Sequence, residues 1–222
     1  MNTFCKAVIF DLDGTLLHTI EDLADSMNYT LKQFDMPTHE LSHHVKAIGN
    51  GLKKYAERSV TEENKNDEFL DKFVSLLALR YRENSMNKTV PFDGIVKLLK
   101  FLEDNNIILN ILSNKRDDFV KELALHYFSD FEFKCANGEL PDVAKKPAPD
   151  AALRIAEECN LKPDEILFIG DSIYDIQTGK NAKMKTVAVT WGYQPENMLI
   201  AEKPDFLAHT PDDLINYIKN LL

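Results

Sequence analysis

Two aspartates, Asp11 and Asp13, directly follow a short apolar run at residues 7–10. Such a run is typical of a buried strand, and Gly14 and Thr15 then favour a turn. Open α/β sheets bind ligands at the carboxyl ends of their strands, so we expect both carboxylates at such an edge. They repel each other unless a cation or a shared proton intervenes, and Mg²⁺ suits these oxygen ligands. The alternative is an acidic turn that caps the next helix.

Polar side chains recur in three later segments, two of which follow apolar runs. They are Ser113-Asn114-Lys115 after the run 107–112, Lys146-Pro147 before a helix-like stretch, and Asp171, with Asp175 four residues on, after the run 166–170. In this order, and together with the Asp11-x-Asp13 pair, they resemble the four motifs of the haloacid dehalogenase superfamily. The resemblance covers nearly the whole chain.

The resemblance implies catalytic roles for the first two aspartates. Asp11 would be the nucleophile, forming an aspartyl-phosphate that water then hydrolyses. Asp13 would protonate the leaving oxygen and later activate the water. Phosphatases of the superfamily have an aspartate at this second position and its dehalogenases lack one, so Asp13 favours phosphoryl transfer over carbon–halogen cleavage.

The same resemblance implies a Mg²⁺ site. Asp171 would bind the metal together with Asp11 and the main-chain carbonyl of Asp13, and Asp175 would orient Asp171 or metal-bound waters. The spacing of Asp171 and Asp175 fits this, because a helix that begins after Asp171 turns Asp175 back towards it. The alternatives are a helix N-cap at Asp171-Ser172 and a solvated position for Asp175.

Candidate phosphate-binding residues come from the two middle motifs. The hydroxyl of Ser113 and the main-chain N–H of Asn114 could donate to a phosphoryl oxygen. Lys146 would place a positive charge beside the phosphoryl group, and with Pro147 it matches the family's lysine-proline pair better than Lys145 does. We expect Lys115 and Arg116 to be a solvated pair, although the mouth of the site is near enough to use one of them.

Residues 11–28 and the segment Ile48-Gly49-Asn50-Gly51-Leu52 most resemble phosphoglycolate phosphatases. Two glycines around a polar residue allow the backbone to approach an anion closely, and the helix N-terminus that follows favours negative charge. Gly49, Asn50 and Gly51 are therefore candidates to bind a small carboxylate. The alternative is a plain turn between helices.

Other functions remain open because related enzymes share the same core motifs. The substrate could be pyrophosphate, a sugar phosphate or a nucleotide, and a β-phosphoglucomutase-like phosphomutase would also keep both aspartates. A non-catalytic binding protein is disfavoured because Asp11 and Asp171 are both present. In each catalytic case the expected partner is a small phosphorylated metabolite.

An all-helical block is expected between the first two strands. Thr19 and Asp22 stand in capping-box positions, and helices are expected after Thr19 and near residues 39–47, 51–60 and 66–83. The apolar stripes that define the first and last of these are Leu23, Met27, Leu31 and Phe34, and Leu70, Phe73, Val74, Leu77 and Tyr81. We interpret residues 18–86 as a small cap domain. His43 and His44, which fall within it, are expected at its surface.

From Pro91 onward, helices and strands alternate. Helices are expected at residues 94–104, 116–126, 149–160, 173–182 and 211–221, and strands at 107–112, 131–136, 166–170, 186–190 and 206–208. This alternation predicts an α/β fold with a doubly wound parallel sheet, resembling the Rossmann-like core of the superfamily. Residues 1–17 and 87–222 would form this catalytic core.

Composition narrows the possible partners of the 222-residue chain. Its net charge of −10 argues against nucleic acid or an anionic membrane as the main partner. No apolar run approaches the roughly 20 residues that span a bilayer, and no signal peptide is visible. Three cysteines without C-x-x-C spacing favour reduced thiols. We therefore expect a cytoplasmic protein, either a monomer or a homodimer.

Overall fold

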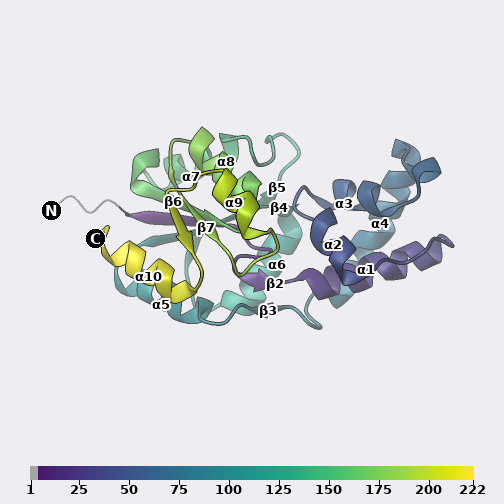
Figure 1. Ribbon diagram of the computed structural model, residues 1–222, viewed down its shortest axis with the longest axis horizontal. Coiled ribbons are helices and arrows are strands. Elements are labelled where there is room, and N and C mark those ends of the chain that lie inside the picture. Colours follow the sequence, from purple (N-terminus) through teal and green to yellow (C-terminus); the bar gives the residue numbers. More distant parts are fainter. Residues whose placement is uncertain (1–4) are drawn as a thin grey trace.

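The computed structural model describes residues 5–222 and contains a six-stranded sheet with helices on both faces (Figure 1). The strands are β1 (Ala7–Phe10), β4 (Ile108–Arg116), β5 (Phe133–Glu139), β6 (Ile166–Gly170), β7 (Lys185–Val189) and β8 (Phe206–Ala208). Their order is β5-β4-β1-β6-β7-β8 and every pairing is parallel. The predicted start of the core at residue 1 lies outside the described residues.

Alternating side chains of the strands divide the core into two layers. Val8 and Phe10 of β1 pack with α5 (Ile95–Asp104), α6 (Asp117–Phe128) and α10 (Pro211–Lys219). Ala7 and Ile9 face the opposite side, where α7 (Asp150–Glu158) covers the sheet. Because successive side chains of a strand point to opposite faces, a wholly apolar run such as β1 needs cover on both. The predicted doubly wound parallel α/β fold is confirmed.

Two further helices complete the second layer. Ile176 of α8 (Ile173–Asn181) and Leu199 of α9 (Glu196–Ala201) are buried against Ala188 of β7. The sequence analysis predicted α8 but not α9, whose six residues are too short for a clear helical stripe. A 3₁₀ turn, η2 (Pro163–Glu165), leads into β6.

The first strand lies in the middle of the sheet. It pairs with β4 on one side and with β6 on the other. The chain adds β4 and β5 on one side of β1, then crosses over and adds β6, β7 and β8 on the other. Such a reversal opens a crevice at the carboxyl ends of the strands on either side of it. The segments that follow β1, β4 and β6 therefore meet at one place.

A block of four helices follows the first strand and projects from the carboxyl ends of the sheet (Figure 1). It contains α1 (Ile20–Gln33), α2 (Leu41–Ala47), α3 (Leu52–Ser59) and α4 (Asp67–Asn84), with a 3₁₀ turn, η1 (Glu62–Asn64), before α4. Met27, Phe73 and Leu77 are fully buried in a core of its own. The predicted helices are present, whereas the cap-domain boundaries 18–86 stay a prediction.

The chain enters and leaves this block side by side. β2 (Leu17–His18) pairs antiparallel with β3 (Val90–Pro91), a short two-stranded ribbon that the sequence did not reveal. Two residues are too few for a periodic signal. The ribbon gives the helical block two adjacent covalent connections to the core.

Asp22 joins those two connections, and the predicted capping box at Thr19 is wrong. Its carboxylate accepts hydrogen bonds from the main-chain N–H groups of Lys88 and Thr89 and from the hydroxyl of Thr89, at 2.8–3.1 Å. Asp22 is only 2% exposed, and a buried carboxylate must be paired. The carboxylate therefore pairs with the returning chain instead of with the helix N-terminus.

His44 is fully buried, so its predicted surface position is wrong, whereas His43 is half-buried. The Nδ1 atom of His44 lies 2.7 Å from the Tyr55 hydroxyl, and Nε2 lies 3.3 Å from the carbonyl oxygen of His39. Burial lowers the pKa of His44 to about 4, which keeps the ring neutral near pH 7. Helix α2 turns this ring onto α3, a contact that spacing along the chain does not reveal.

No helix among residues 5–222 is long and apolar enough to cross a membrane. Cys5, Cys135 and Cys159 are buried free thiols. The predicted cytoplasmic location and the choice between monomer and homodimer stay predictions.

Candidate active site

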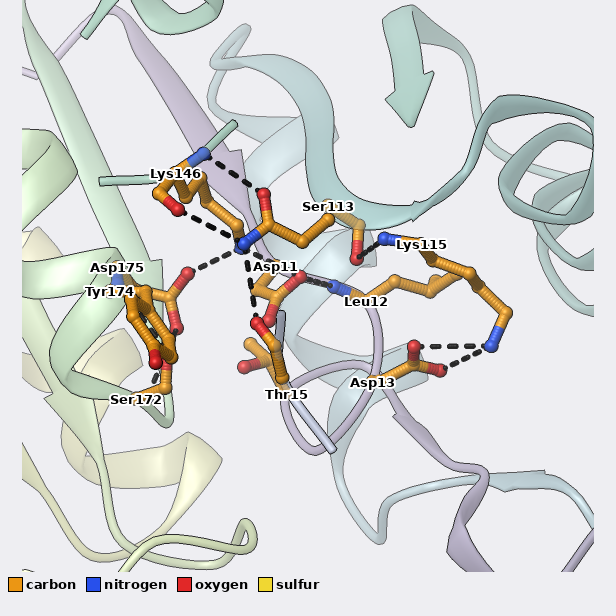
Figure 2. Close-up of polar contacts among 12 residues, drawn as sticks. Asp11, Leu12, Asp13, Thr15, Ser113, Lys115, Lys146, Ser172, Tyr174 and Asp175 are labelled. Atoms are coloured by element: carbon orange, nitrogen blue, oxygen red, sulfur yellow. Dashed lines mark hydrogen bonds and ion pairs between the residues drawn. The ribbon is translucent and has the colours of Figure 1, made fainter. Parts of the chain in front are cut away.

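Three buried carboxylates meet at the carboxyl ends of β1 and β6, and Figure 2 labels two of them, Asp11 and Asp175. Asp11 directly follows β1, Asp171 directly follows the adjacent β6, and Asp175 lies in the first turn of α8. One oxygen from each lies within 4.8 Å of the others. The structure thus brings together aspartates that are up to 164 residues apart in the chain, because the parallel strands β1 and β6 end at the same edge of the sheet.

The cluster carries an excess of negative charge. Burial raises the pKa of Asp11 to about 6; Lys146 opposes this rise, while Asp175 and Asp13 add to it. Burial, together with the charges of Asp11 and Asp175, also raises the pKa of Asp171. A divalent cation would relieve this repulsion, and an all-oxygen donor set suits Mg²⁺. Asp11 and Asp171 therefore fit the role of metal ligands. One oxygen of Asp175 lies within 4.8 Å of an oxygen of each.

Lys146 is the cation inside this cluster. Its Nζ lies 2.9 Å from an Asp11 oxygen and 2.6 Å from an Asp175 oxygen, and its side chain is 3% exposed. Burial disfavours its charge, but the two carboxylates outweigh burial and raise the pKa of Lys146. Its neighbour Lys145 points elsewhere and pairs with Glu139 at 2.7 Å.

The side chain of Asn114 holds Lys146 in place. Its amide oxygen accepts a hydrogen bond from the main-chain N–H of Lys146 at 2.9 Å, and its amide nitrogen donates to the Lys146 carbonyl at 3.1 Å. The sequence analysis considered only the main-chain N–H of Asn114. Its amide joins the end of β4 to the lysine segment.

Asp175 takes part in the helix cap that the sequence analysis considered at Asp171-Ser172, and its expected role of orienting Asp171 or metal-bound waters stays a prediction. Its Oδ2 accepts hydrogen bonds from the main-chain N–H and the hydroxyl of Ser172, forming a capping box at the start of α8. It is 1% exposed, so the solvated position is excluded. A Cβ at Gly170 would lie 2.2 Å from its carboxyl carbon, so only glycine lets β6 approach this closely.

Asp13 turns its side chain away from the cluster. The carboxylate accepts a hydrogen bond from the Thr19 hydroxyl at 2.7 Å and pairs with the Lys115 Nζ at 3.0 and 3.1 Å (Figure 2). Its side chain is therefore free of the three-carboxylate cluster. This orientation suits a group that handles protons better than it suits a side-chain metal ligand.

Lys115 lies within the site rather than in solvent, as the alternative for this pair allowed. Its side chain is 6% exposed and pairs with Asp13. Strand β4 continues to Arg116 instead of ending at residue 112 as predicted. Arg116 is half-buried and pairs with Asp118 at 2.8 Å. Ser113 is also buried, and its hydroxyl oxygen accepts a weak 3.4 Å hydrogen bond from the Lys115 main-chain N–H.

Tyr193 is a site residue that the sequence analysis missed. Its main-chain N–H donates to Asp171 at 2.7 Å, and its hydroxyl accepts from the main-chain N–H groups of Thr19 and Ile20 at 2.7 and 3.1 Å. It thereby links the carboxylate cluster to the first turn of α1. Two residues earlier in the same loop, the indole N–H of Trp191 donates to the Thr15 carbonyl.

A cavity of about 460 Å³ lies between the carboxyl ends of the sheet and the helical block. The core contributes Asp11, Asp13, Ser113, Asn114, Lys115 and Asp171, among others, and the helical block contributes Leu23, Val45, Ile48, Leu52, Tyr55 and Tyr81, among others. Its volume is within the range of small-ligand sites, about 300–1,000 Å³. Most of the charged groups lie at the core end, and the opposite wall is mainly apolar apart from Lys46 of α2.

The segment Gly49–Gly51 contacts the core beside the cavity. Gly49 and Gly51 belong to the described lining and Asn50 does not. The Gly49 carbonyl accepts a hydrogen bond from the Asn114 amide at 3.2 Å. Gly51, at φ 81°, precedes α3, and a Cβ there would lie 2.8 Å from the Lys145 Nζ. The segment therefore docks onto the core, and its contact with substrate stays a prediction.

Comparison with known proteins agrees with this geometry. Residues 8–189 match the family model of haloacid dehalogenase-like hydrolases. The phosphoglycolate phosphatase of Aquifex aeolicus (strain VF5) is 30% identical over 217 residues, which cover 97% of each chain.

Two solved structures have the same fold at similar identity. A predicted phosphoglycolate phosphatase from Haemophilus somnus 129pt is 28% identical, with a TM-score of 0.89 over 98% of this chain and 99% of that one. A predicted phosphatase from Clostridium acetobutylicum is also 28% identical, with a TM-score of 0.81 over 98% and 99%. The chain therefore belongs to the haloacid dehalogenase-like hydrolase family and resembles its phosphoglycolate phosphatases.

Proposed function

We propose that this phosphatase hydrolyses a small phosphomonoester, most simply 2-phosphoglycolate, with Mg²⁺ and through an aspartyl-phosphate on Asp11. The observation that carries the proposal is the buried cluster of Asp11, Asp171 and Asp175, with Lys146 within it. The likeness to phosphoglycolate phosphatases supports the choice of substrate.

The chain's own residues supply a complete route for the bonds and protons. An oxygen of Asp11 attacks phosphorus while the bond from phosphorus to the leaving oxygen breaks, and Asp13 gives its proton to that oxygen. In the second step Asp13 takes a proton from water, the water oxygen bonds to phosphorus, and Asp11 is released with inorganic phosphate. Asp13 is suited to this because its carboxylate faces the cavity rather than the cluster.

Other residues bind and orient the phosphoryl group. Ser113 and Asp11 line the same cavity, where the Ser113 hydroxyl can donate to a phosphoryl oxygen, and Lys146 balances the negative charge. Asp11, Asp171 and the main-chain carbonyl of Asp13 would hold Mg²⁺, and Asp175 would orient them through Lys146 and Ser172. When bound, the metal supplies positive charge that neutralises the carboxylates and the phosphoryl oxygens.

Residues 18–86 would act as a cap over this chemistry. The helical block has a core of its own and joins the sheet through two adjacent strands. A lid attached in this way can close over bound substrate and then open to admit water. In this proposal, the cap contributes to the choice of substrate and the core performs the reaction.

A substrate panel tests the proposal. Purified protein with Mg²⁺ is given 2-phosphoglycolate, pyrophosphate, a hexose phosphate and a nucleoside monophosphate, and released inorganic phosphate is measured. We expect the highest kcat/KM with 2-phosphoglycolate, and no turnover in excess EDTA. Isomerised sugar phosphate without phosphate release would instead indicate a mutase, and unchanged turnover in EDTA would contradict the metal assignment.

A further inference from the structure

The side-chain amide of Asn114 makes hydrogen bonds to two different parts of the molecule. Its oxygen accepts from the main-chain N–H of Lys146 at 2.9 Å, and its nitrogen donates to the Lys146 carbonyl at 3.1 Å and to the Gly49 carbonyl at 3.2 Å. Asn114 belongs to β4 of the core, whereas Gly49 lies in the helical block between α2 and α3. One side chain therefore joins the helical block to the segment that carries Lys146.

The bond to Gly49 completes the pairing of this amide. An asparagine side chain has two N–H donors, so one can serve the Lys146 carbonyl and the other the Gly49 carbonyl. Asn114 is 5% exposed, and a buried donor without a partner is unfavourable. The amide is thus fully paired only while the Gly49 carbonyl lies against the core.

The helical block touches the lysine segment, Lys145-Lys146, at a second point. A Cβ at Gly51 would lie 2.8 Å from the Lys145 Nζ and 3.0 Å from a carboxylate oxygen of Glu139. These two charged groups pair with each other at 2.7 Å. The stretch between α2 and α3 therefore rests on the lysine segment directly, as well as through Asn114.

Lys146 is the place where this contact can affect chemistry. Its Nζ lies 2.9 Å from an oxygen of Asp11 and 2.6 Å from an oxygen of Asp175 (Figure 2). A shift of the Lys146 main chain would move this charge relative to the carboxylate that attacks phosphorus in the proposed reaction. A close-packed interior leaves a buried side chain little room to compensate, and a misplacement of about 1 Å can lower a rate by about 100-fold.

Another contact between the helical block and the core does not involve the lysine segment. Arg82 of α4 forms ion pairs with Asp118 and Glu122 of α6. All three of these side chains are about one-third exposed or more. This contact holds the block to the core without a described link to Lys146, so it provides a comparison for the Asn114 contact.

We propose that Asn114 is a positioning residue that couples docking of the helical block to the position of Lys146. With the Gly49 carbonyl docked, the amide is fully paired and holds the Lys146 main chain through two hydrogen bonds. With the block moved away, one donor loses its partner and the hydrogen-bond network around Lys146 loosens. The inference rests on the proposed function, in which the block is a lid. It makes phosphoryl transfer fastest while substrate is covered.

Gly49→Ala breaks the contact from the side of the helical block and leaves Asn114 and Lys146 unchanged. Gly49 has φ 104°, which alanine adopts only with strain, so the main chain that carries the carbonyl must change. The nearest described atoms to the added Cβ belong to the Tyr174 ring, at 3.8 Å. The new methyl group therefore does not press on the lysine segment.

Hydrogen exchange at the main-chain N–H of Lys146, followed by NMR, is the first readout and needs no substrate. We expect exchange in Gly49→Ala to be faster than in wild type by about 5- to 150-fold, the usual range of a coupling between two sites. Unchanged exchange in a folded variant would overturn the inference. Arg82→Met is the matched control and should change this rate by less than about twofold, because exposed ion pairs contribute little. An equal effect of Arg82→Met would indicate general loosening of the block and would also overturn the inference.

Steady-state kinetics with 2-phosphoglycolate and ethyl phosphate give the second readout. Ethyl phosphate has a methyl group in place of the carboxylate. Gly49→Ala should lower kcat by a similar factor for both substrates, about 10- to 100-fold, with little change in KM. A loss confined to KM for 2-phosphoglycolate would show that Gly49 belongs to a substrate-binding segment and would overturn the positioning role.

Asn114→Ala breaks the same link from the side of the core. The double variant with Gly49→Ala should have a kcat within about threefold of Asn114→Ala alone, because effects on one network are not additive. Effects that multiply would mean that the two residues act independently, which contradicts the coupling. The exchange measurement on Gly49→Ala tests the inference even if Asn114→Ala does not fold.

The outcomes separate this inference from the proposed function. If wild type releases phosphate from no compound of the substrate panel, the proposed function fails, while exchange at Lys146 still decides whether the block and the lysine are coupled. If wild type is a phosphatase and Gly49→Ala changes neither exchange nor kcat, the coupling is wrong and the phosphatase assignment stands.

Discussion

At the carboxyl ends of the sheet, buried charges are paired at short distances, and Lys146 lies within 3 Å of both Asp11 and Asp175. Across the same cavity, the helical block presents mainly apolar side chains, together with Lys46. A network that is already satisfied holds its atoms in place, whereas a mainly apolar wall contacts a ligand chiefly through its shape. The proposed division of labour, with chemistry at the core and selection at the helical block, rests on this difference.

The strongest test of this division is Asp11→Asn. The proposed nucleophile is lost but the shape is kept, so phosphate release should fall below detection for every substrate. The fold should persist, because the substitution also removes one of three repelling carboxylates. Kinetics on the panel and thermal unfolding measure the two effects. A variant with wild-type turnover would rule out the aspartyl-phosphate mechanism.

Asp13→Asn tests the proton-transfer role. We expect kcat to fall by about 10²–10⁴-fold, the usual contribution of general acid–base catalysis. Mg²⁺ affinity, followed by calorimetric titration, should remain close to wild type, because the main-chain carbonyl is unchanged. A comparable loss of metal affinity would show instead that the Asp13 side chain is a ligand.

Lys146→Met tests how much the buried ion pairs of the active site contribute to the free energy of unfolding. Removing one partner of a buried ion pair costs about 3–5 kcal/mol, and Asp11 and Asp175 would lose their shared cation. Lys145→Met is the control, since its pair with Glu139 is about one-third exposed and should contribute about 0–1 kcal/mol. Urea unfolding measures the loss of unfolding free energy in both variants. Equal destabilisation would contradict the preorganised core.

Asn50→Ala has the smallest expected effect. It should raise KM for 2-phosphoglycolate more than for an aryl phosphate, which lacks the carboxylate. Because Asn50 is not among the described lining residues, we expect a change of less than about fivefold, under 1 kcal/mol. Steady-state kinetics with both substrates measure this difference in KM. Equal effects would indicate that Gly49–Gly51 serves only as a turn that docks onto the core.

Local patterns were sufficient to predict most of the elements. The apolar runs at residues 7–10 and 166–170 match β1 and β6, and the run of helices before residue 85 matches α1 to α4. These signals are strong because burial on both faces of a strand, or on one face of a helix, dictates residue type at fixed spacing. Short elements such as β2, β3 and α9 lack enough residues for such a pattern.

The sequence by itself determined which residue types follow each strand, and so which side chains could meet at the carboxyl edge of a parallel sheet. Asp11 and Asp171 were identified in this way, and Lys146 by its resemblance to the family's lysine-proline pair. Only the tertiary structure decided how the remaining polar groups are paired. Lys115, for example, is buried on Asp13 rather than solvated. The physical reason is that partners distant in the chain determine the burial and pairing of a polar group, and local spacing contains no record of them.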